Sequence, residues 1–122
     1  MLYVLAAVLL VITGLAHSYL GEKYILIRLF RNNDLPKLLG GTAFTKNTLR
    51  FAWHLTSVAW FGFAIILVQL AIEPITKQVI ANIIGGTFFI HFGVAFIASK
   101  GKHLSWPIFL VASIAVLYAA NT

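Results

Sequence analysis

The sequence predicts an all-α integral membrane protein, an antiparallel four-helix transmembrane bundle with short interfacial helices in its first cytoplasmic loop. Hydrophobic residues make up 61% of the 122 residues and charged residues 10%, whereas about a quarter of a typical soluble domain is charged. Apolar runs alternate with short segments that carry the basic residues. Because so few charges cannot cover a soluble domain, we expect residues 1–122 to form a single membrane domain.

Residues 1–20 form the first expected span, because the run is apolar and long enough to cross a bilayer. A secretory signal peptide is the alternative, since Ala16, His17 and Ser18 resemble a small-x-small cleavage site. No basic residue precedes the apolar run. This pattern favours an uncleaved helix.

Residues 21–50 form the expected cytoplasmic loop. The segment from Glu22 to Arg31 mixes apolar and basic residues, so it either extends the first helix or lies at the membrane interface. Asn32–Asp34, Pro36 and the pair Gly40–Gly41 interrupt the helical pattern. We therefore expect short interfacial helices joined by turns in this loop.

Three further spans follow, at about residues 51–72, 79–99 and 104–120. The first of these has no charged side chain and ends at the turn Glu73–Pro74. The last is the shortest and carries Trp106 and Tyr118 near its two ends, as aromatic residues do at membrane interfaces. Small residues let helices approach closely in lipid. The small residues expected at helix contacts are Ala81, Gly85, Gly86, Ala115 and Ala119.

The basic residues predict the orientation of the chain in the membrane. Six of the nine lie in residues 21–50 and two are Lys100 and Lys102, while Lys77 alone lies on the other side. Cytoplasmic loops carry such an excess of lysine and arginine. We expect a bacterial-type inner-membrane protein with both termini outside the cytoplasm, and no nucleic-acid partner. The candidates for contact with lipid head groups are Lys23, Arg28, Arg31 and Arg50.

Three histidines fall at similar depths in three of the expected spans. Counting from the nearest basic residues at the helical rise, His17, His54 and His91 lie roughly 9, 6 and 13 Å from the cytoplasmic boundary. Each has a hydroxyl residue three or four positions away on the same helical face. These hydroxyl residues are Thr13, Ser57 and Thr87, and Glu22 is the nearest carboxylate. Because polar groups inside a span are costly toward lipid, we expect this histidine layer to face the bundle interior.

Three interpretations of the histidine layer remain open. Imidazole is a ligand for divalent metal or copper ions and for haem b iron, so the three histidines are candidate metal or haem ligands. Alternatively, His17, His54 and Glu22 handle a proton or substrate near the cytoplasmic mouth. In the third interpretation, each histidine only bonds a neighbouring helix and fixes packing. We expect His103, in a basic loop, to be a solvated surface residue.

The leading functional expectation is a ligand-binding membrane module that uses the histidine layer. The alternatives are a non-catalytic accessory or assembly subunit, which binds a partner membrane protein or another copy of itself, and a minimal oligomeric transporter. The chain contains no cysteine, so it has no thiolate site. No spacing indicates a catalytic group, and the chain resembles small four-span bacterial inner-membrane proteins only in size and hydropathy.

Overall fold

The computed structural model describes residues 1–72 and 74–122, so the expected turn residue Glu73 lies outside the described residues. The main helices are α1 (Leu2–Leu20), α3 (Ala43–Ala71), α4 (Lys77–Ser99) and α5 (Ser105–Asn121). The π-helical segment η1 (Gly21–Leu26) and the short α2 (Ile27–Leu29) follow α1 directly. Throughout the described residues the architecture is all-helical, as the composition predicts.

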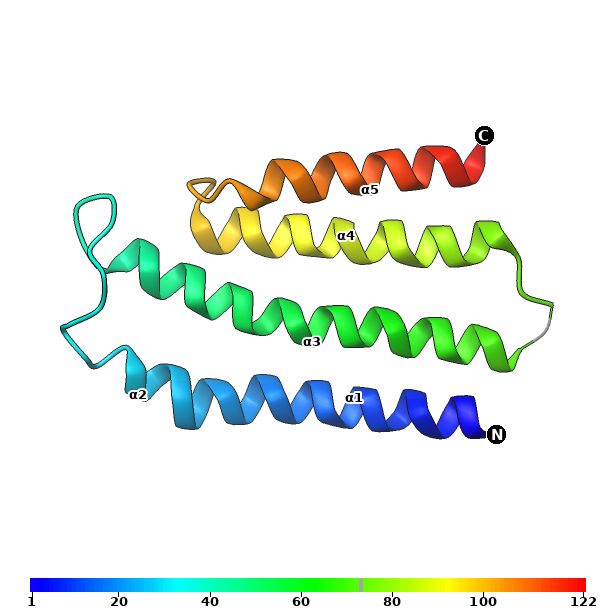
Figure 1. The fold of residues 1–122 in the computed structure, drawn as a ribbon, viewed down its shortest axis with the longest axis horizontal. Helices are drawn as coiled ribbons and strands as arrows, with labels where there is room; N and C mark the ends of the chain where they lie inside the picture. The colour runs from blue at the N-terminus through cyan, green and yellow to red at the C-terminus, as the bar shows by residue number, and fades with distance from the viewer. Residues whose placement is uncertain (73) are drawn as a thin grey trace.

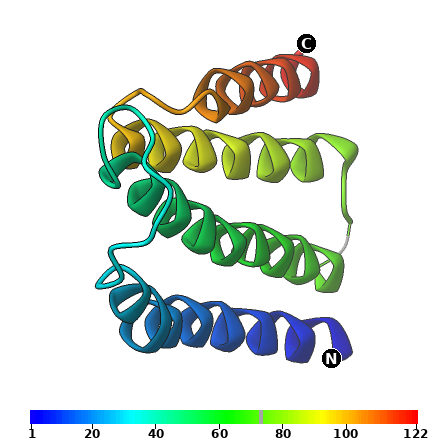
Figure 2. The same cartoon turned by 60° about the vertical axis from the view of Figure 1, so that its left-hand side comes forward.

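The four main helices lie side by side in chain order and alternate in direction (Figure 1, Figure 2). Helix α3 packs on α1 and α4, and α4 packs on α5. Within the described part of the chain, α1 packs on neither α4 nor α5, and α3 does not pack on α5. The antiparallel helices therefore form an open row with three successive interfaces, and no core is shared by all four.

Three continuous helical segments are long and apolar enough to cross a membrane, namely Leu2–Leu29, Ala43–Ala71 and Lys77–Ser99. Helix α5 is also apolar but has only 17 residues. Large apolar side chains are exposed on every main helix, whereas the largest fully buried side chains are Ser57 and Ser113. Small polar residues inside and large apolar residues outside are typical of helices that pack in lipid.

The segment after α1 corrects the expectation of separate interfacial helices. Gly21 has helical dihedrals, φ −61° and ψ −48°, and the helix continues through η1 to Leu29. A side chain on Gly21 would collide with the indole of Trp53 on α3. Because glycine leaves room for this indole, the extended helix stays against α3. The remainder of the loop, residues 32–41, is not helical. It contains a turn in which Leu38 and Gly41 form an isolated antiparallel β-bridge.

A glycine lies beneath a side chain of the next helix at each of the three interfaces. Phe61 covers Gly14 between α1 and α3, Thr87 covers Gly62 between α3 and α4, and Leu117 covers Gly85 between α4 and α5. A Cβ atom at Gly85 would lie 2.7 Å from the Leu117 side chain. The glycines therefore set how closely the helices approach.

The residues expected at helix contacts differ in their surroundings. Gly85 is buried against α5, and Ala81 is half-buried. Gly86 has open space where a side chain would project, and Ala115 and Ala119 are exposed. Among these expected residues, Gly85 thus makes a close helix contact within the chain. Contacts of the exposed alanines with another subunit stay a prediction.

Candidate functional site between α1 and α3

Polar side chains from α1, η1 and α3 gather at one end of the α1–α3 interface. We call this group the α1–α3 polar cluster; its members are His17, Ser18, Glu22, Arg50, His54 and Ser57. Ser18 and Glu22 are four residues apart, and His54 and Ser57 are three apart. Such spacings place side chains on one helical face, so the two faces of the cluster oppose each other across the interface.

Ser57 is the buried end of the cluster, with 1% of its surface exposed. Its hydroxyl donates to the carbonyl oxygen of Gly14 at 2.9 Å. Ser18 donates to the Ser57 oxygen at 2.8 Å, and His17 Nδ1 lies 3.2 Å from the same oxygen. A hydroxyl has one hydrogen to donate. Because Ser57 gives its hydrogen to Gly14, His17 Nδ1 must carry the hydrogen of the remaining bond.

The same reasoning fixes the next bond in the cluster. His54 Nδ1 lies 3.0 Å from the Ser18 oxygen. The single hydroxyl hydrogen of Ser18 already points to Ser57, so the Ser18 oxygen can only accept from His54. His54 Nδ1 therefore carries a hydrogen.

Glu22 closes the cluster at its more exposed end. Glu22 Oε2 lies 3.2 Å from His54 Nε2, and Glu22 Oε1 lies 2.9 Å from Arg50 Nη2. A neutral His54 with its hydrogen on Nδ1 would present a bare nitrogen to a carboxylate, and two acceptors cannot bond each other. A hydrogen bond between His54 Nε2 and Glu22 Oε2 therefore needs a proton on one of these two atoms. The Arg50 guanidinium lies against the other Glu22 oxygen and favours a carboxylate that accepts from both neighbours.

Two tryptophans of α3 hold the ring of His17. The His17 ring stacks on Trp53, with centroids 4.5 Å apart and an interplanar angle of 5°, and meets Trp60 edge-on at 5.0 Å. The Trp53 indole N–H also donates to the His17 carbonyl oxygen at 3.0 Å. His17 is therefore positioned from both sides by α3.

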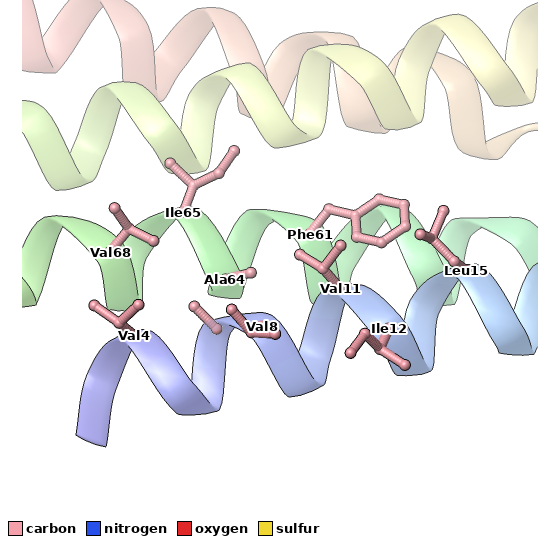
Figure 3. A pocket seen from close by; sticks show the side chains of 10 residues that line it. Val4, Val8, Val11, Ile12, Leu15, Phe61, Ala64, Ile65 and Val68 are labelled. Atoms are coloured by element: carbon pink, nitrogen blue, oxygen red, sulfur yellow. The ribbon is translucent and has the colours of Figure 1, made fainter. Parts of the chain in front are cut away.

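An apolar groove continues the α1–α3 interface beyond the polar cluster (Figure 3). It has a volume of about 580 Å³ and is lined only by apolar residues, including Val8, Val11, Phe61 and Ala64. The hydrogen-bond chain ends where Ser57 bonds Gly14. In the described residues, the polar path thus enters the α1–α3 pair from one end and stops inside it.

His91 lies apart from the polar cluster. Its Nδ1 is 2.8 Å from the carbonyl oxygen of Thr87 on its own helix, and its ring contacts Phe88 and Phe109. No hydrogen bond joins it to His17 or His54 in the described residues. The expected histidine layer is therefore divided into one network that contains His17 and His54, and a separate His91.

Three hydroxyl residues were predicted as partners of the histidines, and of these three Ser57 is, among the described residues, the one whose hydroxyl bonds a histidine. Ser57 bonds His17, while Thr13 is exposed and Thr87 donates its hydroxyl to the Ile83 carbonyl. Ser18 was missed as a partner. Its position four residues before Glu22 is the signal that could have identified it, because that spacing places both on one face.

A metal site would need histidine or carboxylate side chains that converge on one ion. Within the described residues, no group of three or more histidine, aspartate or glutamate side chains is arranged to hold a metal ion. The assignment of His17, His54 and His91 as metal or haem ligands stays a prediction.

His103 is less exposed than the solvated surface residue that we expected from the sequence. It bonds Ser105 at 2.8 Å, and its ring lies near Phe44 and Phe51, at 5.9 and 5.1 Å. These aromatic rings of α3 lie beside the loop between α4 and α5. His103 is therefore half-buried.

The candidate lipid-binding residues have two kinds of surroundings. Arg50 is paired with Glu22 and lies over the Phe30 ring at 4.9 Å. Lys23, Arg28 and Arg31 are exposed on or just beyond the extension of α1. Contact of these residues with lipid head groups stays a prediction.

Comparison of the chain with protein-family models, with curated proteins and with solved structures finds no match. Over residues 1–72 and 74–122, the fold defines the class as an all-helical protein with three helices long and apolar enough to span a membrane.

Proposed function

We propose that the chain is a membrane-spanning module that takes up a proton at the α1–α3 polar cluster and holds it between His54 and Glu22. The observation that supports this function is the direction of the hydrogen bonds. Ser57 and Ser18 each have one hydrogen, and both hydrogens point toward the buried end. This arrangement supports a proton at the His54–Glu22 contact, because it leaves His54 Nδ1 as the donor to Ser18.

The surroundings of the cluster suit reversible uptake from one side. The side chains of Glu22 and His54 are 30% and 32% exposed, so they are accessible from outside the helix pair, while Ser57 is buried. The apolar groove beyond Ser57 offers no acceptor for onward transfer. The module therefore exchanges its proton with the side of the membrane at which Glu22 and Arg50 lie.

Replacement of Glu22 by glutamine tests the proposal. A glutamine amide can donate to His54 Nε2, so the bare nitrogen no longer needs a proton. We expect the native chain to hold a proton between His54 Nε2 and Glu22, and His54 in Glu22→Gln to carry hydrogen on Nδ1 alone. Nitrogen NMR of histidine-labelled full chain in lipid nanodiscs distinguishes these states.

Asp34→Asn is the matched control, because Asp34 lies in the exposed loop and its described hydrogen bond is made by its backbone N–H to Asn32. This variant removes the same charge and should leave the proton between His54 and Glu22 in place. A native His54 with a bare Nε2, or an unchanged His54 in Glu22→Gln, contradicts the proposal.

The orientation of the module follows from the basic residues. We infer that the end with Glu22 and Arg50 faces the cytoplasm of an inner membrane, since eight of the nine lysines and arginines lie on that side of the predicted spans. Reporter tags at Met1 and Thr122 should both report the outer side, and a tag near Lys37 the cytoplasm. A cytoplasmic report from either terminus contradicts this orientation.

A further inference from the structure

A second cavity lies between α3 and α4, on the side of α3 that is away from α1. Its volume is about 140 Å³. Helix α3 contributes Ala59, Gly62 and Phe63 to its walls, and α4 contributes Thr87, Phe88 and His91. The walls are therefore apolar and aromatic, apart from one threonine and one histidine.

His91 is the polar group of this cavity that lacks a complete set of partners. It is 8% exposed, and its Nδ1 lies 2.8 Å from the Thr87 carbonyl oxygen. A carbonyl only accepts, so Nδ1 carries the hydrogen, and Nε2 of the neutral ring is a bare acceptor. Among the described residues, no donor bonds this Nε2.

Thr87 does not supply the missing donor. Its hydroxyl hydrogen is directed to the Ile83 carbonyl oxygen at 2.8 Å. The polar groups that face this cavity can therefore only accept a hydrogen bond. A ligand that satisfies them must bring a donor and be otherwise apolar, because an unmatched polar group is costly to bury.

The size of the cavity limits the ligand further. An apolar cavity of about 150 Å³ accommodates a single benzene ring. Aromatic rings also pack favourably on other aromatic rings, and Phe63 and Phe88 provide them here. One aromatic ring with one hydroxyl donor meets each of these conditions.

We propose that the α3–α4 cavity binds a small phenol, with the ring between Phe63 and Phe88 and the hydroxyl donating to His91 Nε2. This site is separate from the α1–α3 polar cluster and does not depend on the proton-holding function.

Phenol and toluene are the probes, since they share a shape and differ by a hydroxyl in place of a methyl group. Binding is measured to full-length chain in nanodiscs, with empty nanodiscs as the reference for partition into lipid. One neutral hydrogen bond corresponds to a preference for phenol of roughly 2- to 12-fold. Equal affinity of the native chain for the two probes overturns the proposal, as does absence of binding by phenol.

Two variants separate the hydrogen bond from the space. His91→Leu should bind both probes with equal affinity, because the acceptor is lost and the walls stay apolar. Ala59→Leu should bind neither, because the added side chain fills the cavity. Ala52→Leu is the control on the exposed face of α3 and should retain the native preference. Phenol binding by Ala59→Leu at native affinity overturns the proposal.

A measurement on the native chain avoids dependence on how His91→Leu folds. The nitrogen resonance of His91 Nε2 should shift with phenol and stay in place with toluene, because only phenol donates to it. An Nε2 resonance that does not move at saturating phenol overturns the proposal.

Discussion

In both the α1–α3 pair and the α4–α5 pair, a side chain of the second helix packs over a glycine of the first. In the first pair Phe61 covers Gly14, and in the second Leu117 covers Gly85. Four residues before each covering side chain, a buried serine donates to the carbonyl oxygen of the covered glycine. These bonds are Ser57 to Gly14 at 2.9 Å and Ser113 to Gly85 at 2.8 Å. The backbones thus approach through a shared arrangement of glycine and serine.

The surroundings of the two serines are opposite in character. Ser57 also accepts from Ser18 and His17, so it ends a chain of polar groups. Near Ser113 the ring of Phe109, one turn away on α5, packs on Phe88 and His91. Within the described residues, the one hydrogen bond of the Ser113 side chain is to Gly85.

This contrast separates close helix packing from the chemistry of the side chains around it. The glycine and serine bring the helices together, and the residues one turn away decide whether the interface holds polar groups or aromatic rings. We propose a proton for the polar α1–α3 pair, and for the aromatic surroundings of His91 a phenol, whose ring is apolar and whose hydroxyl is a donor. Three predictions test or sharpen this comparison.

One of the two largest effects is expected at Gly85, where a Cβ atom would lie 2.7 Å from the Leu117 side chain. Gly85→Leu should lower the free energy of unfolding by about 1–3 kcal/mol, because the new side chain would collide with Leu117 and push α5 away. Gly86→Leu is the matched control, since Gly86 has open space in that direction. Thermal unfolding in detergent measures both. Equal stability of the two variants would show that the covered glycine does not set the packing.

Ser57→Ala should lower the free energy of unfolding more than Ser113→Ala, because the Ser57 hydroxyl has more hydrogen-bond partners. Ser57→Ala leaves the hydroxyl of Ser18 and the Nδ1–H of His17 without their acceptor, and should cost about 1–3 kcal/mol of unfolding free energy. Ser113→Ala removes a single bond and should cost about 1 kcal/mol. The same unfolding measurement compares them. A larger loss in Ser113→Ala would contradict the comparison.

The smallest expected effect is the coupling between histidines. In a double-mutant cycle, His17→Ala and His54→Ala should depart from additivity by about 0.5–1 kcal/mol, because both belong to one hydrogen-bond network. His54→Ala and His91→Ala should add to within about 0.5 kcal/mol, since no network joins them. Strong coupling of His54 with His91 would instead favour the single histidine layer expected from the sequence.

The sequence by itself determined the helices and the composition of their surfaces. Length, hydropathy and the sites of charge depend on local residues, so they predicted the all-helical fold and four apolar spans. In the described residues, three of the corresponding helices are long and apolar enough to cross a membrane. Spacing also identified His17, His54, Ser57 and Glu22 as candidates. The depth of a residue along a helix can be counted, because every residue adds the same rise.

Only the tertiary structure decided which way each helix faces. Rotation about a helix axis depends on the neighbouring helices, and no count along the chain supplies it. Thr13 therefore lies exposed while Ser18 joins the cluster, and His91, predicted to share a layer with His17 and His54, lines a separate cavity. Gly85 and Gly86 are adjacent in sequence, yet only Gly85 faces α5, because one residue turns the helix by about 100°.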